Sequence, residues 1–168
     1  MEKQFKGMKK AIVVGASSGI GMEVARLLLK QGWKVGVAAR RIDLLKTIGD
    51  VETEQIDVTK PEATQQLQHL IERVGGMDLF FYASGIGKQN RELKEDIELA
   101  TVETNAVGFT RMIGEAYRYF AQQGHGHIAP YRPSPVPRDW VLHRRIRLQR
   151  RCRTFICRHS SNRQTLAA

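Results

Sequence analysis

Cysteine is scarce in this sequence of 168 residues, and long apolar runs are absent. The two cysteines, Cys152 and Cys157, are too few for a disulfide framework, and a C-x4-C spacing without a second pair does not fit a zinc site. No stretch approaches the roughly 18 apolar residues of a membrane span, and the basic start lacks the apolar core of a signal peptide. We therefore expect a cytoplasmic protein of one domain, with no membrane contact and no metal site.

Lysine and glycine are both missing from residues 129–168, which hold ten arginines, four of the five prolines and the single acid Asp139. This stretch carries a net charge of +9, whereas residues 1–128 carry 17 basic against 16 acidic side chains. The overall hydrophobic content of 42% is ordinary for a globular protein. We expect residues 1–129 to form a folded domain and residues 130–168 to form an irregular tail that is disordered or poorly packed.

Short apolar runs alternate with helical patterns through the first part of the chain. The runs predict strands at 10–15, 33–39 and 77–82, a third strand ending at 54–58 and a possible fifth beginning at 125–129. Helices are predicted at 22–30, 42–48, 65–74, 92–103 and 106–122. This alternation is typical of right-handed βαβ units, so the fold class is α/β with the first four or five strands of a doubly wound parallel sheet.

A glycine-rich turn joins the first predicted strand to the first helix. Gly15 permits a tight turn, Gly19 lets the backbone approach a pyrophosphate, and Gly21 lets the helix pack closely on the strand. Free N–H groups at the start of the helix, together with its dipole, favour phosphate. The alternative is an ordinary βα turn. We predict a Rossmann-like dinucleotide site whose first segment comprises Gly15, Ser17, Ser18, Gly19, Ile20 and Gly21.

The G-x-x-x-G-x-G spacing closely resembles that of the short-chain dehydrogenase/reductases, and three further matches follow in order. Asp57-Val58 is similar to the family's adenine-contacting pair after the third strand. Tyr82-Ala83-Ser84-Gly85 resembles its N-N-A-G motif with both asparagines replaced, and Asn105 matches the helix asparagine that holds an active-site water. The resemblance covers about residues 9–129. It implies that Asp57, Val58, Ala83, Ser84 and Gly85 contact the cofactor and that Asn105 is a catalytic position.

The end of the second predicted strand bears on the choice of cofactor. A site specific for NAD usually has Asp or Glu there to accept from the ribose 2′-hydroxyl, whereas arginine accommodates a 2′-phosphate. Here Ala39 leaves room, and Arg40 and Arg41 supply guanidinium groups. The alternative is a solvated pair at a helix start. We predict that NADP(H) is preferred over NAD(H).

The family's catalytic set is largely missing. The resemblance implies hydride transfer between nicotinamide and a small carbonyl or alcohol, with a tyrosine, a lysine four residues later and a serine thirteen residues before the tyrosine. No tyrosine of this chain has lysine at that spacing: Tyr82, Tyr117, Tyr119 and Tyr131 are followed there by Ile86, Ala121, Gln123 and Pro135. Of the catalytic positions only Asn105 remains, so we expect an inactive or nearly inactive product.

A slipped reading frame near Ala129 accounts for this loss. Suppose that each original codon consisted of the last base of one present codon and the first two bases of the next. The present pair Asp139-Trp140 then forces leucine at position 140, and the pair Trp140-Val141 forces glycine at position 141. The same rule permits serine at 133, tyrosine at 146 and lysine at 150, which are the family's spacings. The present residues there are Pro133, Ile146 and Arg150. We interpret residues 130–168 as out-of-frame sequence.

Two other functions stay open. The chain is alternatively a non-catalytic dinucleotide-binding module. The tail is alternatively a nucleic-acid-binding arm, but its arginines occur without lysine and with only Trp140 and Phe155 as stacking candidates, so we do not expect nucleic acid as a partner. The arginines in question are Arg144, Arg145, Arg147, Arg150, Arg151 and Arg153.

The tail also bears on assembly. The resemblance implies a homo-oligomer whose interface is incomplete here, because one of its two helices is missing. Without the catalytic helix, we expect exposed apolar surface at Val107, Met112, Ile113 and Tyr117, together with one open sheet edge.

Overall fold

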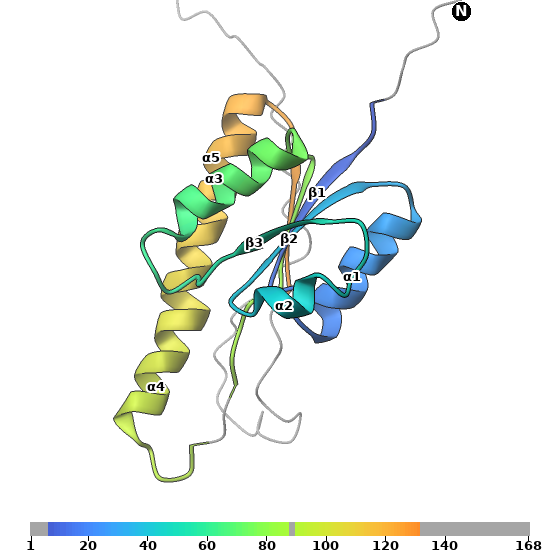
Figure 1. Ribbon diagram of the computed structural model, residues 1–168. Coiled ribbons are helices and arrows are strands. Elements are labelled where there is room, and N and C mark those ends of the chain that lie inside the picture. The colour runs from blue at the N-terminus through green and yellow to red at the C-terminus, as the bar shows by residue number, and fades with distance from the viewer. Residues whose placement is uncertain (1–6, 88–89, 132–168) are drawn as a thin grey trace, which may run out of the picture.

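The computed structural model describes residues 7–87 and 90–131, which form a three-layer α/β/α unit (Figure 1). Its centre is a five-stranded sheet in the order β3-β2-β1-β4-β5, and every neighbouring pair is parallel. The order reverses between β1 and β4, so the sheet is doubly wound, as predicted. The strands are β1 Lys10–Val14, β2 Lys34–Ala39, β3 Glu52–Gln55, β4 Leu79–Tyr82 and β5 His127–Pro130.

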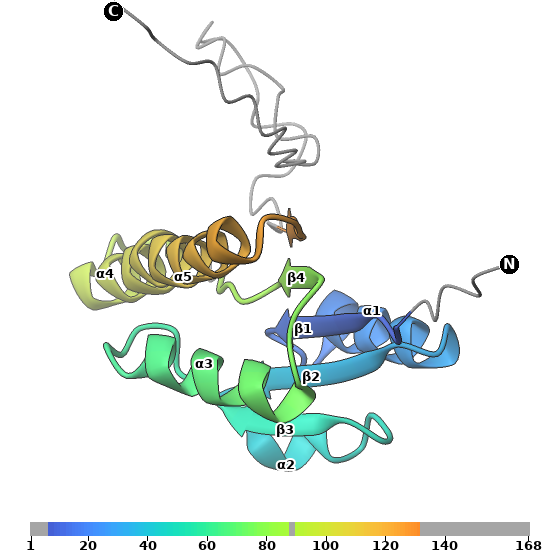
Figure 2. The ribbon, with the colours of Figure 1, turned by 90° about the horizontal axis from the view of Figure 1, so that it is seen from above.

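Helices cover both faces of the sheet (Figures 1 and 2). The helices α1 (Gly19–Lys30) and α2 (Ile42–Leu45) lie on one face, whereas α3 (Ala63–Val74) and α5 (Phe109–Gln123) lie on the other. A further helix, α4 (Glu95–Val102), leads through the π-helical segment η1 (Glu103–Gly108) into α5 without a break. None of the helices in the described part of the chain is long and apolar enough to cross a membrane.

Two apolar clusters, one on each face, hold these layers together. Because side chains alternate along a strand, β1 contributes Ile12 and Val14 to the cluster under α3 and α5, and Ala11 and Val13 to the cluster under α1 and α2. All four side chains are fully buried. This two-sided burial explains the continuous apolar run in the sequence of β1.

Several elements differ from the predicted bounds. The third strand ends at Gln55 rather than at Val58, because the Ile56 amide makes the last bond to the Ala39 carbonyl and Asp57 then bonds within its own loop. The helix predicted through Ile48 is the single turn α2. The two helices predicted at 92–103 and 106–122 are one continuous rod, since η1 carries the chain through the expected break.

Apolar side chains of η1 and α5 were expected to be exposed, which is correct at two positions and wrong at one. Val107 and Tyr117 are 39% and 48% exposed, but Met112 is fully buried. Met112 shares a face with Ala116 and Phe120, four and eight residues further on, and that face packs on the sheet. Ile113 is half-buried against the same cluster, and β5 is an edge strand among the described residues.

Candidate functional site

A cleft of about 530 Å³ lies where the carboxyl ends of the strands meet, beside the reversal between β1 and β4. This is the position at which open α/β sheets bind their ligands. Most of the predicted cofactor residues line it, although Gly19, Ile20, Gly21 and Asn105 do not. The lining residues are Gly15, Ser17, Ser18, Ala39, Arg40, Arg41, Ile56, Asp57, Val58, Ala83, Ser84, Gly85, Ile86 and Thr104.

The glycine-rich loop is packed so tightly that side chains cannot enter at two positions. Gly15 has a φ of +91°, and a Cβ on it would overlap the backbone nitrogen of Ser84. A Cβ on Gly21 would overlap the carbonyl oxygen of Gly15, so α1 approaches β1 as closely as its backbone allows. Gly19 differs: it has a φ of +60°, and a Cβ on it would meet nothing within 4 Å. The space beside Gly19 is therefore open to a ligand.

The start of α1 offers backbone donors to an anion. Its N-cap, Ser18, makes no side-chain capping bond in the described structure, and the first turn contains no acidic residue. The first N–H groups of a helix have no partner within the helix, and the helix dipole makes that end positive. The loop and helix start can thus hold a phosphate group through backbone N–H groups.

Two arginines stand at the edge of the cleft after β2. The Arg41 Nη2 atom donates to the Ser17 Oγ atom over 3.4 Å, which directs this guanidinium towards the glycine-rich loop. The Gln55 Nε2 atom donates to the Arg40 carbonyl over 3.0 Å and fixes the backbone there. Ala39, which precedes them, is 5% exposed and presents no charge. The edge is therefore cationic.

Asp57 lines the same cleft as these arginines. Its Oδ1 atom accepts from the Thr59 hydroxyl at 2.8 Å and from the Thr59 amide at 3.1 Å. Burial by itself raises the pKa of Asp57, but the two bonds from Thr59 and the charges of Arg40 and Lys60 outweigh it. The resulting pKa lies below the ordinary value for aspartate, so Asp57 is a carboxylate at neutral pH.

Tyr82 ends β4, but its side chain belongs to the core and not to the cleft. The ring is 1% exposed and meets the Phe109 ring edge-on, with centroids 5.4 Å apart. Within the described residues its hydroxyl oxygen has no hydrogen-bond partner, and burial raises its pKa to about 12. Tyr82 therefore cannot exchange a proton with a ligand in the cleft. The following residues, Ala83 to Gly85, do line the cleft.

Asn105 occupies the π-helical segment η1 and acts on the backbone of the opposite loop. Its Oδ1 atom accepts from the Ile86 amide at 2.9 Å, and its Nδ2 atom donates to the Ile86 carbonyl at 2.6 Å. Both functions of the amide side chain are thus used to hold Ile86, which lines the cleft. π-Helical turns are often found at functional sites.

Sequence reasoning did not single out Ile56, Ile86 and Thr104, although all three line the cleft. Each stands directly beside a predicted residue, namely Asp57, Gly85 or Asn105. Adjacency in the sequence is the signal that could have found them. No group of three potential metal-ligating His, Cys, Asp or Glu side chains occurs in residues 7–87 and 90–131.

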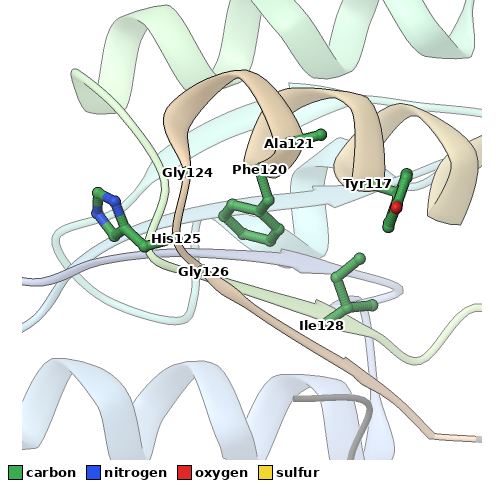
Figure 3. Close-up of a pocket in the computed structure, with 7 residues that line it drawn as sticks. All are labelled: Tyr117, Phe120, Ala121, Gly124, His125, Gly126 and Ile128. Atoms are coloured by element: carbon green, nitrogen blue, oxygen red, sulfur yellow. The ribbon is translucent and has the colours of Figure 1, made fainter. Parts of the chain in front are cut away.

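A second cavity lies between the end of α5 and β5, lined by Tyr117, Phe120, Ala121, Gly124, His125, Gly126 and Ile128 (Figure 3). Its volume is about 30 Å³, the space of about one water molecule. None of the predicted site residues lines it, and it is too small for a nucleotide. The cleft beside the glycine-rich loop, where most of the predicted site residues meet, is the candidate site.

The model of the short chain dehydrogenase family matches residues 9–130. The chain belongs to this family. One similar protein is an uncharacterized oxidoreductase of Listeria monocytogenes, which is 37% identical over 131 residues. The match covers 71% of this chain and 53% of the relative, so the chain spans about half the length of the curated relatives that it matches.

Solved structures of other short-chain dehydrogenases have the same fold. An actinorhodin polyketide ketoreductase variant with NADPH is 31% identical, with a TM-score of 0.67 over 73% of this chain and 52% of that one. An alcohol dehydrogenase from Thermococcus sibiricus, complexed with 5-hydroxy-NADP, is 28% identical, with a TM-score of 0.62. The match covers 70% of this chain and 55% of that one. The family binds nicotinamide cofactors, and the size and backbone donors of the cleft fit such a ligand.

Proposed function

We propose that this chain is the cofactor-binding part of an NADP(H)-dependent short-chain oxidoreductase, and that in its present form it binds NADP(H) but does not turn over a carbonyl or alcohol substrate. The observation that carries the cofactor preference is the pair of arginines at the cleft edge, with Arg41 bonded to Ser17 of the glycine-rich loop. An adenosine 2′-phosphate placed between the loop and β2 would meet both guanidinium groups.

Electrostatics favours the phosphate over a bare hydroxyl at this edge. A ribose 2′-hydroxyl needs an acceptor, but Ala39 supplies none where a site specific for NAD usually has a carboxylate. A phosphate group instead brings negative charge, which guanidinium groups bind through charge-assisted hydrogen bonds. Two of the solved relatives are described with NADPH or an NADP derivative, which supports the same choice.

The chain's own residues would divide the work of binding. Gly15 to Gly21 and the start of α1 would hold the pyrophosphate, Asp57 and Val58 would border the adenine, and Ala83 to Gly85 would border the far part of the cofactor. Asn105 would act by holding Ile86 in place. When bound, the cofactor supplies a hydride for carbonyl reduction or accepts one from an alcohol.

We infer the lack of turnover because neither a tyrosine nor a lysine lines the cleft in the described part of the chain. Tyr82 is the tyrosine nearest in sequence to the cleft residues, and its buried hydroxyl has its pKa raised to about 12. The positions at which a restored frame permits the catalytic serine, tyrosine and lysine are Pro133, Ile146 and Arg150, which lie outside the described residues. We place the cofactor domain at residues 1–129, the out-of-frame tail at 130–168 and the protein in the cytoplasm.

The cofactor proposal is tested by the dissociation constants of NADPH and NADH, measured by fluorescence titration of the full chain. We expect NADPH to bind at least about tenfold more tightly, since a hydrogen bond to a charged group contributes about 1.5–3 kcal/mol and exposure to solvent reduces it. Replacing Arg40 and Arg41 together by alanine should bring the ratio to about 1–2. Lys46 is an exposed cation beyond α2 that does not line the cleft. Lys46→Ala is therefore the control and should leave the ratio unchanged. Equal or weaker binding of NADPH by the wild type contradicts the proposal.

The inactivity and its cause have a separate test. We expect no NADPH oxidation with small carbonyl substrates above the rate without protein, whereas a chain whose frame is restored after Ala129 should be active. Sequencing the coding DNA across codons 128–131 shows whether a base is missing there. Turnover by the present chain, or an intact frame, contradicts this part of the proposal.

A further inference from the structure

The start of α5 contacts the turn that follows β3 through two residues one helical turn apart. The Arg111 Nη1 atom donates to the Val58 carbonyl oxygen over 2.6 Å. Gly108 faces the same residue, since a Cβ on it would lie 2.7 Å from the Val58 Cγ2 atom. Residues three apart lie on one side of a helix, so Gly108 provides the close approach and Arg111 the bond.

The backbone of this turn lies beyond the hydrogen bonds of the sheet, although the Val58 side chain is buried in the core. The strand β3 ends at Gln55, and the last bond of the chain to β2 is made by the Ile56 amide. Asp57 makes bonds within the turn, to the Thr59 amide and hydroxyl and through its carbonyl to the Lys60 amide. The bond from Arg111 therefore ties the turn to another element.

The charge of Arg111 is directed to this carbonyl and not to the carboxylate on its own helix. Glu115, one turn further along α5, accepts instead from the Gln68 Nε2 atom at 2.7 Å and from the Arg118 Nη2 atom at 2.6 Å. Arg111 is half-buried. A guanidinium in this position makes a charge-assisted bond that is stronger than a bond between neutral groups.

The same helical rod also reaches the opposite wall of the cleft. Asn105 holds the backbone of Ile86, and Thr104, only 6% exposed, lines the cleft between the two walls. The segment from Thr104 to Arg111 thus contacts both Val58 and Ile86, two residues that line the cleft. Asn105 bonds to the backbone of Ile86, and Arg111 bonds to the backbone of Val58.

We infer that Arg111 is a positioning residue for the adenine end of the cofactor, because it holds the Val58 carbonyl and so fixes the Asp57-Val58 turn that borders the cleft. This inference rests on the proposed function, since it needs adenine to lie against that turn. Arg111 does not line the cleft itself and acts through Val58.

The test compares Arg111→Met with Arg118→Met in the full chain. Both changes remove a guanidinium from α5, but Arg118 bonds to Glu115, whereas Arg111 bonds to the Val58 carbonyl. The probes are adenosine 2′,5′-bisphosphate, which has the adenine and the 2′-phosphate, and reduced nicotinamide mononucleotide, which has neither. We expect Arg111→Met to raise the dissociation constant of the bisphosphate about five- to tenfold. Arg118→Met should stay within about twofold of the wild type.

The nicotinamide probe separates positioning from a general structural role. Its dissociation constant should stay within about twofold of the wild-type value in both variants, whereas a general loosening of the fold would weaken both probes together. If Arg111→Met does not fold, Arg111→Lys carries the test. Lysine keeps a charged donor but not the planar guanidinium, so it should still bind the bisphosphate about two- to threefold more weakly than Arg118→Met.

The outcomes distinguish this inference from the proposed function. Equal binding of the bisphosphate by the Arg111 and Arg118 variants overturns the inference alone, and so does an equal loss for both probes. A wild-type chain that binds neither NADPH nor the bisphosphate overturns the proposed function, and the inference with it.

Discussion

Replacing Gly21 by alanine should destabilise the protein, although alanine is the better helix former. The change adds one methyl group where α1 meets the glycine-rich loop. That methyl would overlap the Gly15 carbonyl oxygen and lie 2.9 Å from the carbonyl carbon, whereas ordinary contacts between carbon atoms are about 3.5–4.0 Å. Because the atoms in the way are backbone, α1 must move by about 1 Å away from β1.

The magnitude follows from two opposing effects. Overpacking of this kind costs about 1–3 kcal/mol, and the clash with backbone places Gly21→Ala near the upper end. The gain in helix propensity returns about 0.8–1.0 kcal/mol. The free energy of unfolding should therefore fall by about 2 kcal/mol. Gly114→Ala in α5 is the matched control, because its Cβ would meet only the Arg118 Nη1 atom at 3.7 Å. That change should raise stability by about 0.5–1 kcal/mol.

Urea unfolding followed by far-UV circular dichroism measures both variants. With a urea dependence of about 2 kcal/mol per molar, Gly21→Ala should lower the midpoint by about 1 M and Gly114→Ala should raise it by about 0.3–0.5 M. A midpoint for Gly21→Ala at or above the wild-type value would refute the reasoning, and so would equal shifts in the two variants.

Two further perturbations have defined outcomes. Tyr82→Phe should raise the free energy of unfolding by about 1 kcal/mol, because it removes a buried hydroxyl that has no partner among the described residues. The control, Tyr117→Phe at an exposed site, should stay within about 0.5 kcal/mol of the wild type. If urea unfolding shows that Tyr82→Phe is less stable than the wild type, the Tyr82 hydroxyl is bonded. Asp57→Asn should be less stable than the wild type at pH 7, because the pKa of Asp57 is lowered in the folded protein and its carboxylate stabilises the fold above the unfolded pKa of about 3.9. This difference should close as the pH falls below that value, and a difference that does not depend on pH contradicts the assignment.

The parts of the fold that the sequence predicted well are those with local backbone constraints. Gly15 and Gly21 stand where a Cβ overlaps backbone, so their spacing alone indicates how the first strand, loop and helix pack. The apolar run at residues 11–14 of β1 indicates burial on both faces and hence a parallel sheet. The residues that follow the strands line one cleft because parallel strands end at the same edge.

The parts that were missed depend on contacts between distant residues. The bonds from Asn105 to Ile86 and from Arg111 to Val58 join positions that are 19 and 53 residues apart, and neither has a periodic signal. Burial of Met112 was missed for a related reason. Met112 was expected to be uncovered by the loss of the catalytic helix, but its face of α5 packs on the sheet instead.

We propose that the cleft beside the glycine-rich loop is the nucleotide site. The most direct measurement is the change in backbone amide NMR signals of the full chain on addition of NADPH. We expect changes at Gly15 to Gly21, Arg40 and Arg41, Asp57 and Val58, and Ala83 to Gly85, with none at the cavity between α5 and β5. Changes confined to that cavity, or no changes at a saturating concentration of NADPH, would contradict it.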